Sequence, residues 1–145
     1  MKKYLLFAFV TLSVLSLVHT KSLDRADKVY FFNMGRRNLM DNKFAQAIVK
    51  FNTLIKADTS LHEAYFLRGI AKYNLNDYIG PLSDFHAAIQ KNPVYTQAFH
   101  YMAITYSQLS RYDDALKDYD YAIDLRPDYL GIYYSRGITH LMAQH

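Results

Sequence analysis

A period of 34 residues runs through most of this sequence and limits the folds that it can adopt. Small residues recur at that interval, without insertion or deletion, at Gly35, Gly69, Ala103 and Gly137. Aromatic residues keep the same register four residues earlier, at Phe31, Tyr65, Phe99 and Tyr133. Such a period is typical of arrays in which each unit buries its apolar face against its neighbours. We therefore expect one domain of stacked units, and we number the places of each unit from 1 to 34, starting at Lys28.

The copy at 96–129 shows the pattern most completely. Besides its small residue at place 8, it has Tyr119 at place 24, Pro127 at place 32, and Ala115 and Ala122 at places 20 and 27. This combination resembles the tetratricopeptide repeat (TPR) family, whose 34-residue unit is a helix-turn-helix hairpin. The resemblance covers three full units and a half unit, 28–61, 62–95, 96–129 and 130–145.

The resemblance implies an all-α fold in which about 3.5 repeats stack into a right-handed superhelix. Small residues at places 8, 20 and 27 allow the two helices of a hairpin to approach closely, and aromatics at places 4 and 24 fill the space between hairpins. Seven helices are expected after an N-terminal leader of residues 1–20, over 25–40, 44–57, 61–75, 79–91, 95–109, 112–125 and 129–143.

Local signals support these boundaries. Asn42 and Asn76 lie in the expected hairpin turns, and asparagine tolerates the left-handed conformation better than most residues. Pro93 and Pro127 should stop the second helices, because proline cannot continue an α-helix. A further hairpin turn is expected at Ser110.

Two departures from the pattern predict local differences. The first unit has Thr59 where proline is usual, so we expect the end of its second helix to be less sharply defined. The second unit has Gly80 and Pro81 where an alanine is usual. Because proline is tolerated in the first turn of a helix, we expect a displaced helix start and no break.

Residues 1–20 are typical of a secretory signal peptide. Lys2 and Lys3 precede an uncharged, mostly apolar run of about 15 residues, which is shorter than the roughly 20 needed to span a bilayer. An uncleaved membrane anchor and a packed N-terminal helix are the alternatives. Residues 21–27 form a short lead-in, in which Asp24 or Asp27 could cap the first helix. The expected location is the periplasm or cell envelope, with no membrane contact after cleavage.

Composition and motifs argue against several functional classes. The chain has no cysteine, and its net charge of +4 includes no long basic stripe of the kind that nucleic-acid binding requires. The histidines lack the HExxH spacing of a zinc protease, and there is no phosphate-binding loop or GxSxG motif. We therefore expect no enzyme activity, no cofactor and no metal site. The aspartates of 113–124 are expected to form an exposed acidic face.

In the TPR family the first helix of each unit lines a concave groove. Carried over place by place, the groove residues of this chain are Phe32, Arg36, Phe66, Ile70, Tyr73, His100, Ile104, Tyr134 and Ile138. Some family members hold a C-terminal carboxylate with Lys, Asn and Arg here, whereas this set has one cation, Arg36. A mainly apolar groove suits a hydrophobic peptide or an amphipathic helix.

The sequence therefore predicts a scaffold that binds a protein or peptide partner. An alternative is the N-terminal, partner-positioning or substrate-positioning domain of a longer enzyme whose catalytic part lies beyond His145. A third is a membrane-anchored assembly factor with an uncleaved leader. The helix expected at 129–143 keeps apolar residues on its outward side, so a C-terminal extension or self-association could cover it.

Overall fold

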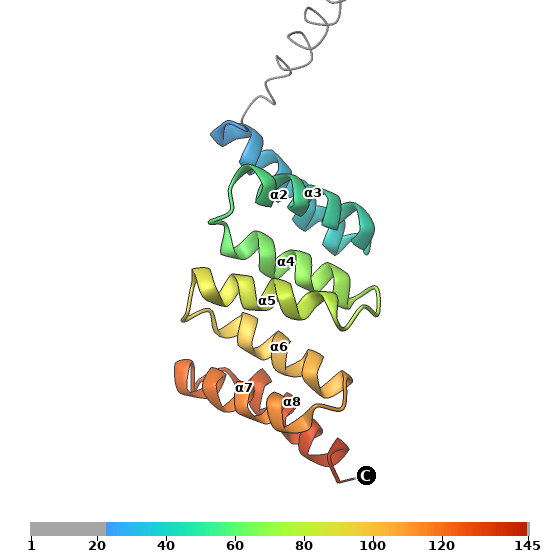
Figure 1. Ribbon diagram of the computed structural model, residues 1–145, viewed down its shortest axis with the longest axis vertical. Helices are drawn as coiled ribbons and strands as arrows, with labels where there is room; N and C mark the ends of the chain where they lie inside the picture. Colours follow the sequence, from blue (N-terminus) through green and yellow to red (C-terminus); the bar gives the residue numbers. More distant parts are fainter. Residues whose placement is uncertain (1–22, 145) are drawn as a thin grey trace, which may run out of the picture.

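The computed structural model describes residues 23–144, and these form a single stack of α-helices that runs from α2 at one end to α8 at the other (Figure 1). The expectations for residues 1–20 lie outside the described residues. The helices are α2 (Arg25–Met40), α3 (Phe44–Ala57), α4 (His62–Tyr73), α5 (Gly80–Lys91), α6 (Thr96–Gln108), α7 (Tyr112–Leu125) and α8 (Leu130–Met142). The all-α prediction of seven helices in paired stacking is confirmed.

The hairpin turns depend on residues in the left-handed conformation. Asn42 and Asn76 have φ angles of 57° and 61°, as predicted, and Ser110, expected only to lie in a turn, has a φ of 57°. At the start of the array, Asp24 caps α2, because its carboxylate accepts a hydrogen bond from the Asp27 amide at 2.8 Å. Asp27 reciprocates by accepting from the Asp24 amide, which completes a capping box.

The prediction that the second helix of the first unit has a poorly defined end is wrong. α3 ends at Ala57, the same place in the repeat at which α5 and α7 end. Asp58 replaces the missing proline, because its carboxylate accepts a hydrogen bond from the Ser60 amide at 3.0 Å and pairs with Lys28 at 2.8 Å. These contacts hold the pKa of Asp58 well below its usual value, so its carboxylate stays ionised and keeps its pair with Lys28.

The predicted displaced start of α5 is confirmed. α3 and α7 begin at place 17, whereas α5 begins two residues later in its unit, at Gly80, with Pro81 in its first turn. The side chain of Asp77 accepts hydrogen bonds from the amides of Ile79, at 3.1 Å, and Gly80, at 2.8 Å. Asp77 therefore satisfies the amides that the shortened helix leaves unpaired.

The core of each hairpin is an aromatic ring that rests on the small residue of place 8. A Cβ atom on Gly35 would lie 2.7 Å from the ring of Phe51, and one on Gly69 would lie 2.5 Å from the ring of Phe85. Both phenylalanines are fully buried. In these two hairpins glycine allows the second helix to cross the first at closest approach.

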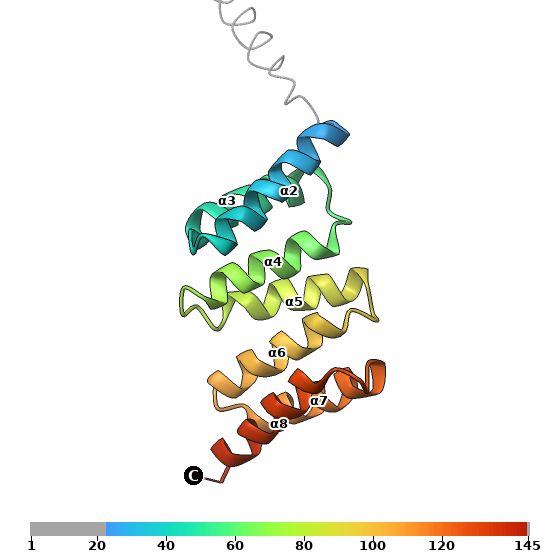
Figure 2. The same ribbon diagram turned by 180° about the vertical axis from the view of Figure 1, so that it is seen from behind.

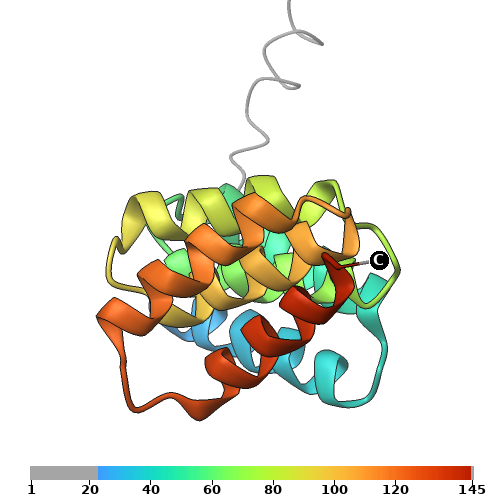
Figure 3. The same ribbon diagram turned by 90° about the horizontal axis from the view of Figure 1, so that it is seen from below.

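The first helices of the units form the inner side of the stack. α2 contacts α4, α4 contacts α6, and α6 contacts α8, whereas α3, α5 and α7 make no contact with one another within residues 23–144. Curvature brings elements on the inner side together and separates those on the outer side. The two faces appear in the opposite views of Figures 1 and 2, and the view along the stack shows the helices one behind another (Figure 3).

Candidate peptide-binding surface

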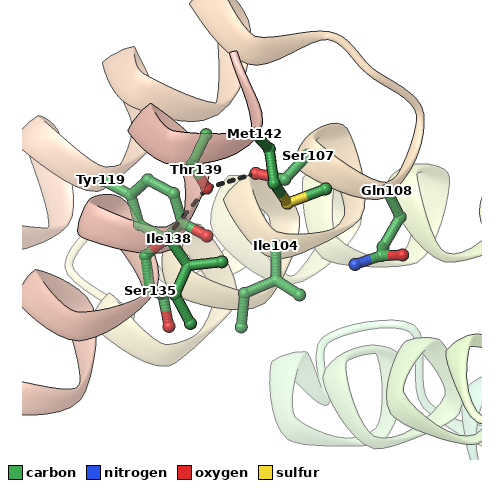
Figure 4. A pocket seen from close by; sticks show the side chains of 8 residues that line it. All are labelled: Ile104, Ser107, Gln108, Tyr119, Ser135, Ile138, Thr139 and Met142. Atoms are coloured by element: carbon green, nitrogen blue, oxygen red, sulfur yellow. Dashed lines mark hydrogen bonds between the residues drawn. The ribbon is translucent and has the colours of Figure 1, made fainter. Parts of the chain in front are cut away.

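The inner surface carries a small cavity where α6 meets α8. Its volume is about 180 Å³, and its lining residues are Ile104, Ser107, Gln108, Tyr119, Ser135, Ile138, Thr139 and Met142 (Figure 4). They come from three helices, because Tyr119 reaches in from α7 between the two first helices. Two members of the predicted groove, Ile104 and Ile138, therefore meet at this cavity.

Hydroxyl groups form the polar part of the cavity. Ser107 Oγ lies 2.7 Å from Thr139 Oγ1, a contact that joins α6 to α8 (dashed in Figure 4). Each hydroxyl oxygen also lies close to a backbone carbonyl of its own helix, Ser107 to that of Ala103 and Thr139 to that of Ser135. One of the two hydroxyls therefore donates to the other, and the second donates to its carbonyl. Both hydroxyls are neutral, and their protons are directed at protein acceptors, so this polar part of the cavity carries no charge. Ile104, Ile138 and Met142 form apolar walls.

His100 lies beneath this region and fixes its geometry from below. Its side chain is 6% exposed, and its Nε2 lies 3.0 Å from Ser135 Oγ. Burial lowers the pKa of His100, so the ring is neutral at pH 7. Nδ1 is buried and has no hydrogen-bond partner in the described part of the chain. The favoured tautomer carries its proton on Nε2, because an unpaired N–H at Nδ1 would cost more than an unpaired lone pair; Ser135 then donates to the Gly131 carbonyl at 3.0 Å.

Comparison with known proteins supports the repeat assignment. The family model described as TPR repeat matches residues 105–144. Among solved structures, the first TPR of Spaghetti (RPAP3) bound to HSP90 peptide SRMEEVD superposes with a TM-score of 0.80 at 19% identity, over 86% of this chain and 99% of that one. The protein has a TPR fold.

Two further structures show how widely the arrangement is shared. The crystal structure of MamA gives a TM-score of 0.74 at 22% identity, covering 78% of this chain and 66% of MamA. The second TPR domain of human RPAP3, in complex with HSP70 peptide SGPTIEEVD, gives 0.74 at 19% identity, over 77% and 93% of the two chains. A search of curated proteins returned no match. The TPR domain is thus structurally similar to TPR domains that bind peptides.

The nine predicted groove residues of the TPR domain differ in accessibility. Arg36, Tyr134 and Ile138 are exposed, and Phe32, Ile70, Tyr73 and Ile104 are half-buried. Phe66 and His100 are buried, with 8% and 6% of their surfaces exposed. Phe66 packs against the rings of Tyr95, Tyr101 and Phe85 at centroid distances of 5.0, 5.6 and 5.9 Å.

The expectation that Phe66 and His100 line the open groove therefore needs correction. Both support the inner surface from beneath, because aromatic rings cover them, from their own unit and, for Phe66, also from Tyr101 of the next unit. Sequence reasoning also missed Tyr119, Ser135 and Thr139. The available signal was the hydroxyl pair Ser135 and Thr139, one turn apart on a helix whose neighbouring groove places are apolar.

Other types of site have little support in the TPR domain. Within residues 23–144, no three His, Asp or Glu side chains converge as metal ligands would. None of the helices described by the structure is long and apolar enough to cross a membrane. The predicted acidic face is exposed at Asp113, Asp120 and Asp124, but Asp118 is half-buried, and this part of the prediction is wrong.

Proposed function

We propose that the inner surface of this TPR domain binds a peptide segment of a protein partner and that the cavity between α6 and α8 takes one of its side chains. The cavity carries the proposal, because it is a concave, mainly apolar site with convergent polar groups on a repeat scaffold. Phe32, Ile70, Tyr73 and Tyr134 extend the surface along the stack.

The chemistry of the cavity favours an uncharged, mainly apolar side chain, such as leucine or methionine. Ile104, Ile138 and Met142 offer apolar contacts, whereas the hydroxyls of Ser107 and Thr139 already satisfy each other. A charged group would lose its hydration here without gaining a partner of opposite charge. We expect micromolar affinity, about −8 kcal/mol.

A free carboxylate at the end of the peptide is not expected to matter. The peptides named in the two RPAP3 complexes end in Glu-Glu-Val-Asp. In this chain Arg36 is the one cation among the predicted groove residues, and its guanidinium lies 6.0 Å from the centre of the Phe32 ring. We therefore expect the peptide SRMEEVD to bind no better with a free C-terminus than with an amidated one.

Peptides selected from a random library on the intact domain provide the test. For such a peptide we expect the double variant Ile104→Ser, Ile138→Ser to raise Kd at least tenfold in calorimetry, because both walls of the cavity are lost. Val49→Ser is the matched control, since Val49 is 58% exposed on α3, a helix of the outer side of the stack. Unchanged affinity in the double variant, with its helicity intact, would refute the proposal.

We also propose that the domain works outside the cytoplasm. The support is the pattern of residues 1–20, two lysines followed by an apolar run. Intact mass spectrometry of the protein from its native cell tests this directly. A mass lower by about 20 residues supports export with cleavage, and a retained leader argues against it.

A further inference from the structure

The three junctions between consecutive first helices differ at one pair of places, place 12 of one unit and place 6 of the next. The pair is Leu39 and Leu67 where α2 meets α4, Tyr73 and Tyr101 where α4 meets α6, and Ser107 and Ser135 where α6 meets α8. Leu39 and Leu67 pack against one core cluster, and Ser107 and Ser135 line one cavity (Figure 4). The junction with the cavity is therefore the one at which both side chains of the pair are small.

The junction of α4 with α6 is the best template for the contents of the cavity. Both junctions have isoleucine at place 9 of each helix, Ile70 and Ile104 in the template and Ile104 and Ile138 at the cavity. Both have threonine at place 10 of the second helix, Thr105 and Thr139. Since these walls are alike, the clearest difference is the loss of two phenol rings. The cavity corresponds to the volume that tyrosine side chains fill one unit earlier.

Tyr101 shows which contacts a ring makes in this volume. Its ring packs against those of Phe66 and Phe85, at centroid distances of 5.6 and 6.3 Å. These phenylalanines hold places 5 and 24, where the third unit has His100 and Tyr119. Tyr119 lines the cavity, and His100 Nε2 lies 3.0 Å from the hydroxyl of a serine that also lines it. The aromatic neighbours of a ring are therefore present at the cavity as well.

We propose that the cavity takes an aromatic side chain, phenylalanine or tyrosine, of the bound peptide. This inference rests on the proposed function and narrows its uncharged, mainly apolar side chain to one chemical class. The volume of about 180 Å³ suits a single ring, since an apolar cavity of about 150 Å³ binds benzene. An aromatic side chain also gains from edge-to-face contact with neighbouring rings, which an aliphatic one cannot make.

Two small molecules, p-cresol and 4-methylcyclohexanol, test the cavity without a peptide. Both carry a methyl group and a hydroxyl on a six-membered ring, and only p-cresol is aromatic. In methyl NMR spectra of the full-length protein, we expect millimolar p-cresol to shift the signals of Ile104 and Ile138 saturably. The saturated analogue should bind at least fivefold more weakly. Equal affinity of the two molecules would overturn the choice of an aromatic occupant.

Ser135→Tyr restores the residue of the preceding unit and should fill the cavity from within. We expect its affinity for p-cresol to fall at least tenfold while its helicity is kept. Ser83→Tyr is the matched control, because it adds the same ring at an exposed place on α5 and should bind p-cresol as the parent does. Ser107→Tyr makes the same test if Ser135→Tyr does not fold. Parent-like binding of p-cresol by a folded cavity variant overturns the proposal.

Peptides selected on the intact domain extend the test to the partner. We expect them to share a phenylalanine or tyrosine whose replacement by leucine raises Kd at least fivefold. Peptides that depend on Ile104 and Ile138 but bind through leucine or methionine would overturn this inference and leave the proposed function standing. Peptides whose affinity is unchanged in Ile104→Ser, Ile138→Ser would refute the proposed function, and with it the peptide as the source of the ring.

Discussion

The second and third units have an aspartate at the same place in the repeat, but the two aspartates have opposite environments. In the second unit Asp84, 2% exposed, accepts hydrogen bonds from Arg68 Nε at 3.0 and 3.1 Å and pairs with Lys72 at 2.8 Å. In the third unit Asp118 occupies the same place, but the two cations are replaced by Met102 and Tyr106. Asp118 Oδ2 is buried and makes no hydrogen bond within the described residues.

The pKa of Asp118 reflects this loss. Burial, with a smaller contribution from the neighbouring Asp114, raises the pKa of this carboxyl to about 6, against an opposing effect of Lys117. The difference between the units shows that the repeat preserves backbone geometry and packed volume, while the chemistry at one place can change from ion pair to unpaired carboxyl. Three substitutions test this comparison, in order of decreasing effect.

Removing a cation from the second unit should have the largest effect. Arg68→Met gives the second unit the residue of the third, and it leaves Asp84 buried with only Lys72 beside it. Breaking a buried pair in this way should cost about 3 kcal/mol in the free energy of unfolding at pH 7, measured with urea. Lys43→Met is the control, because Lys43 and Asp41 form an exposed pair that should contribute less than about 1 kcal/mol. Equal effects of the two variants would mean that burial of Asp84 is unimportant.

Exchanging the small residue at place 8 should have an intermediate effect. Gly69→Ala puts a methyl group 2.5 Å from the fully buried ring of Phe85, which has no room to move. We expect a loss of about 2 kcal/mol despite alanine's higher helix propensity. The reciprocal change Ala103→Gly should cost only about 1 kcal/mol, mainly in helix propensity. Thermal unfolding compares the two, and a stabilising Gly69→Ala would contradict the close approach.

Neutralising Asp118 should have the smallest effect and depend on pH. Because its folded-state pKa lies above the ordinary value of 3.8, the protonated form favours the fold, and this contribution is lost as pH rises through about 6. Asp118→Asn should therefore stabilise the protein at pH 8, by about 1 kcal/mol since the side chain is partly exposed, and should give no gain at pH 4. Urea unfolding at both pH values measures this. The same gain at both would show that ionisation of Asp118 is not the cause.

Much of the fold could be predicted from local sequence signals. The period placed Gly35, Gly69 and Ala103 at helix crossings, and Asn42 and Asn76 marked the turns. The end of α3 was placed correctly, at residue 57, but was expected to be loosely defined, because its stop comes from Asp58, whose carboxylate acts through Ser60 and through Lys28, 30 residues away. A contact across that separation leaves no mark in the local pattern.

The candidate site was less predictable than the fold. The family pattern named places on the first helices, and two of these, Ile104 and Ile138, do line the cavity. Burial depends on tertiary contacts, so Phe66 and His100 were assigned to the open groove although Tyr95, Tyr101 and Tyr129 lie against them. Tyr119 was assigned only to packing, yet it also borders the cavity.

By itself, the sequence determined the repeat, the number of helices and the order of the stack, because these follow from periodicity and from the local conformations of glycine, asparagine and proline. Only the tertiary structure decided which polar groups find partners. Within residues 23–144, Asp84 pairs with two cations while Asp118 forms no ion pair, and Phe51 and Phe85 cover glycines while Gly137 is left uncovered. The physical reason is that pairing and coverage depend on side chains brought together from different helices, and a repeat pattern specifies the helices without specifying those encounters.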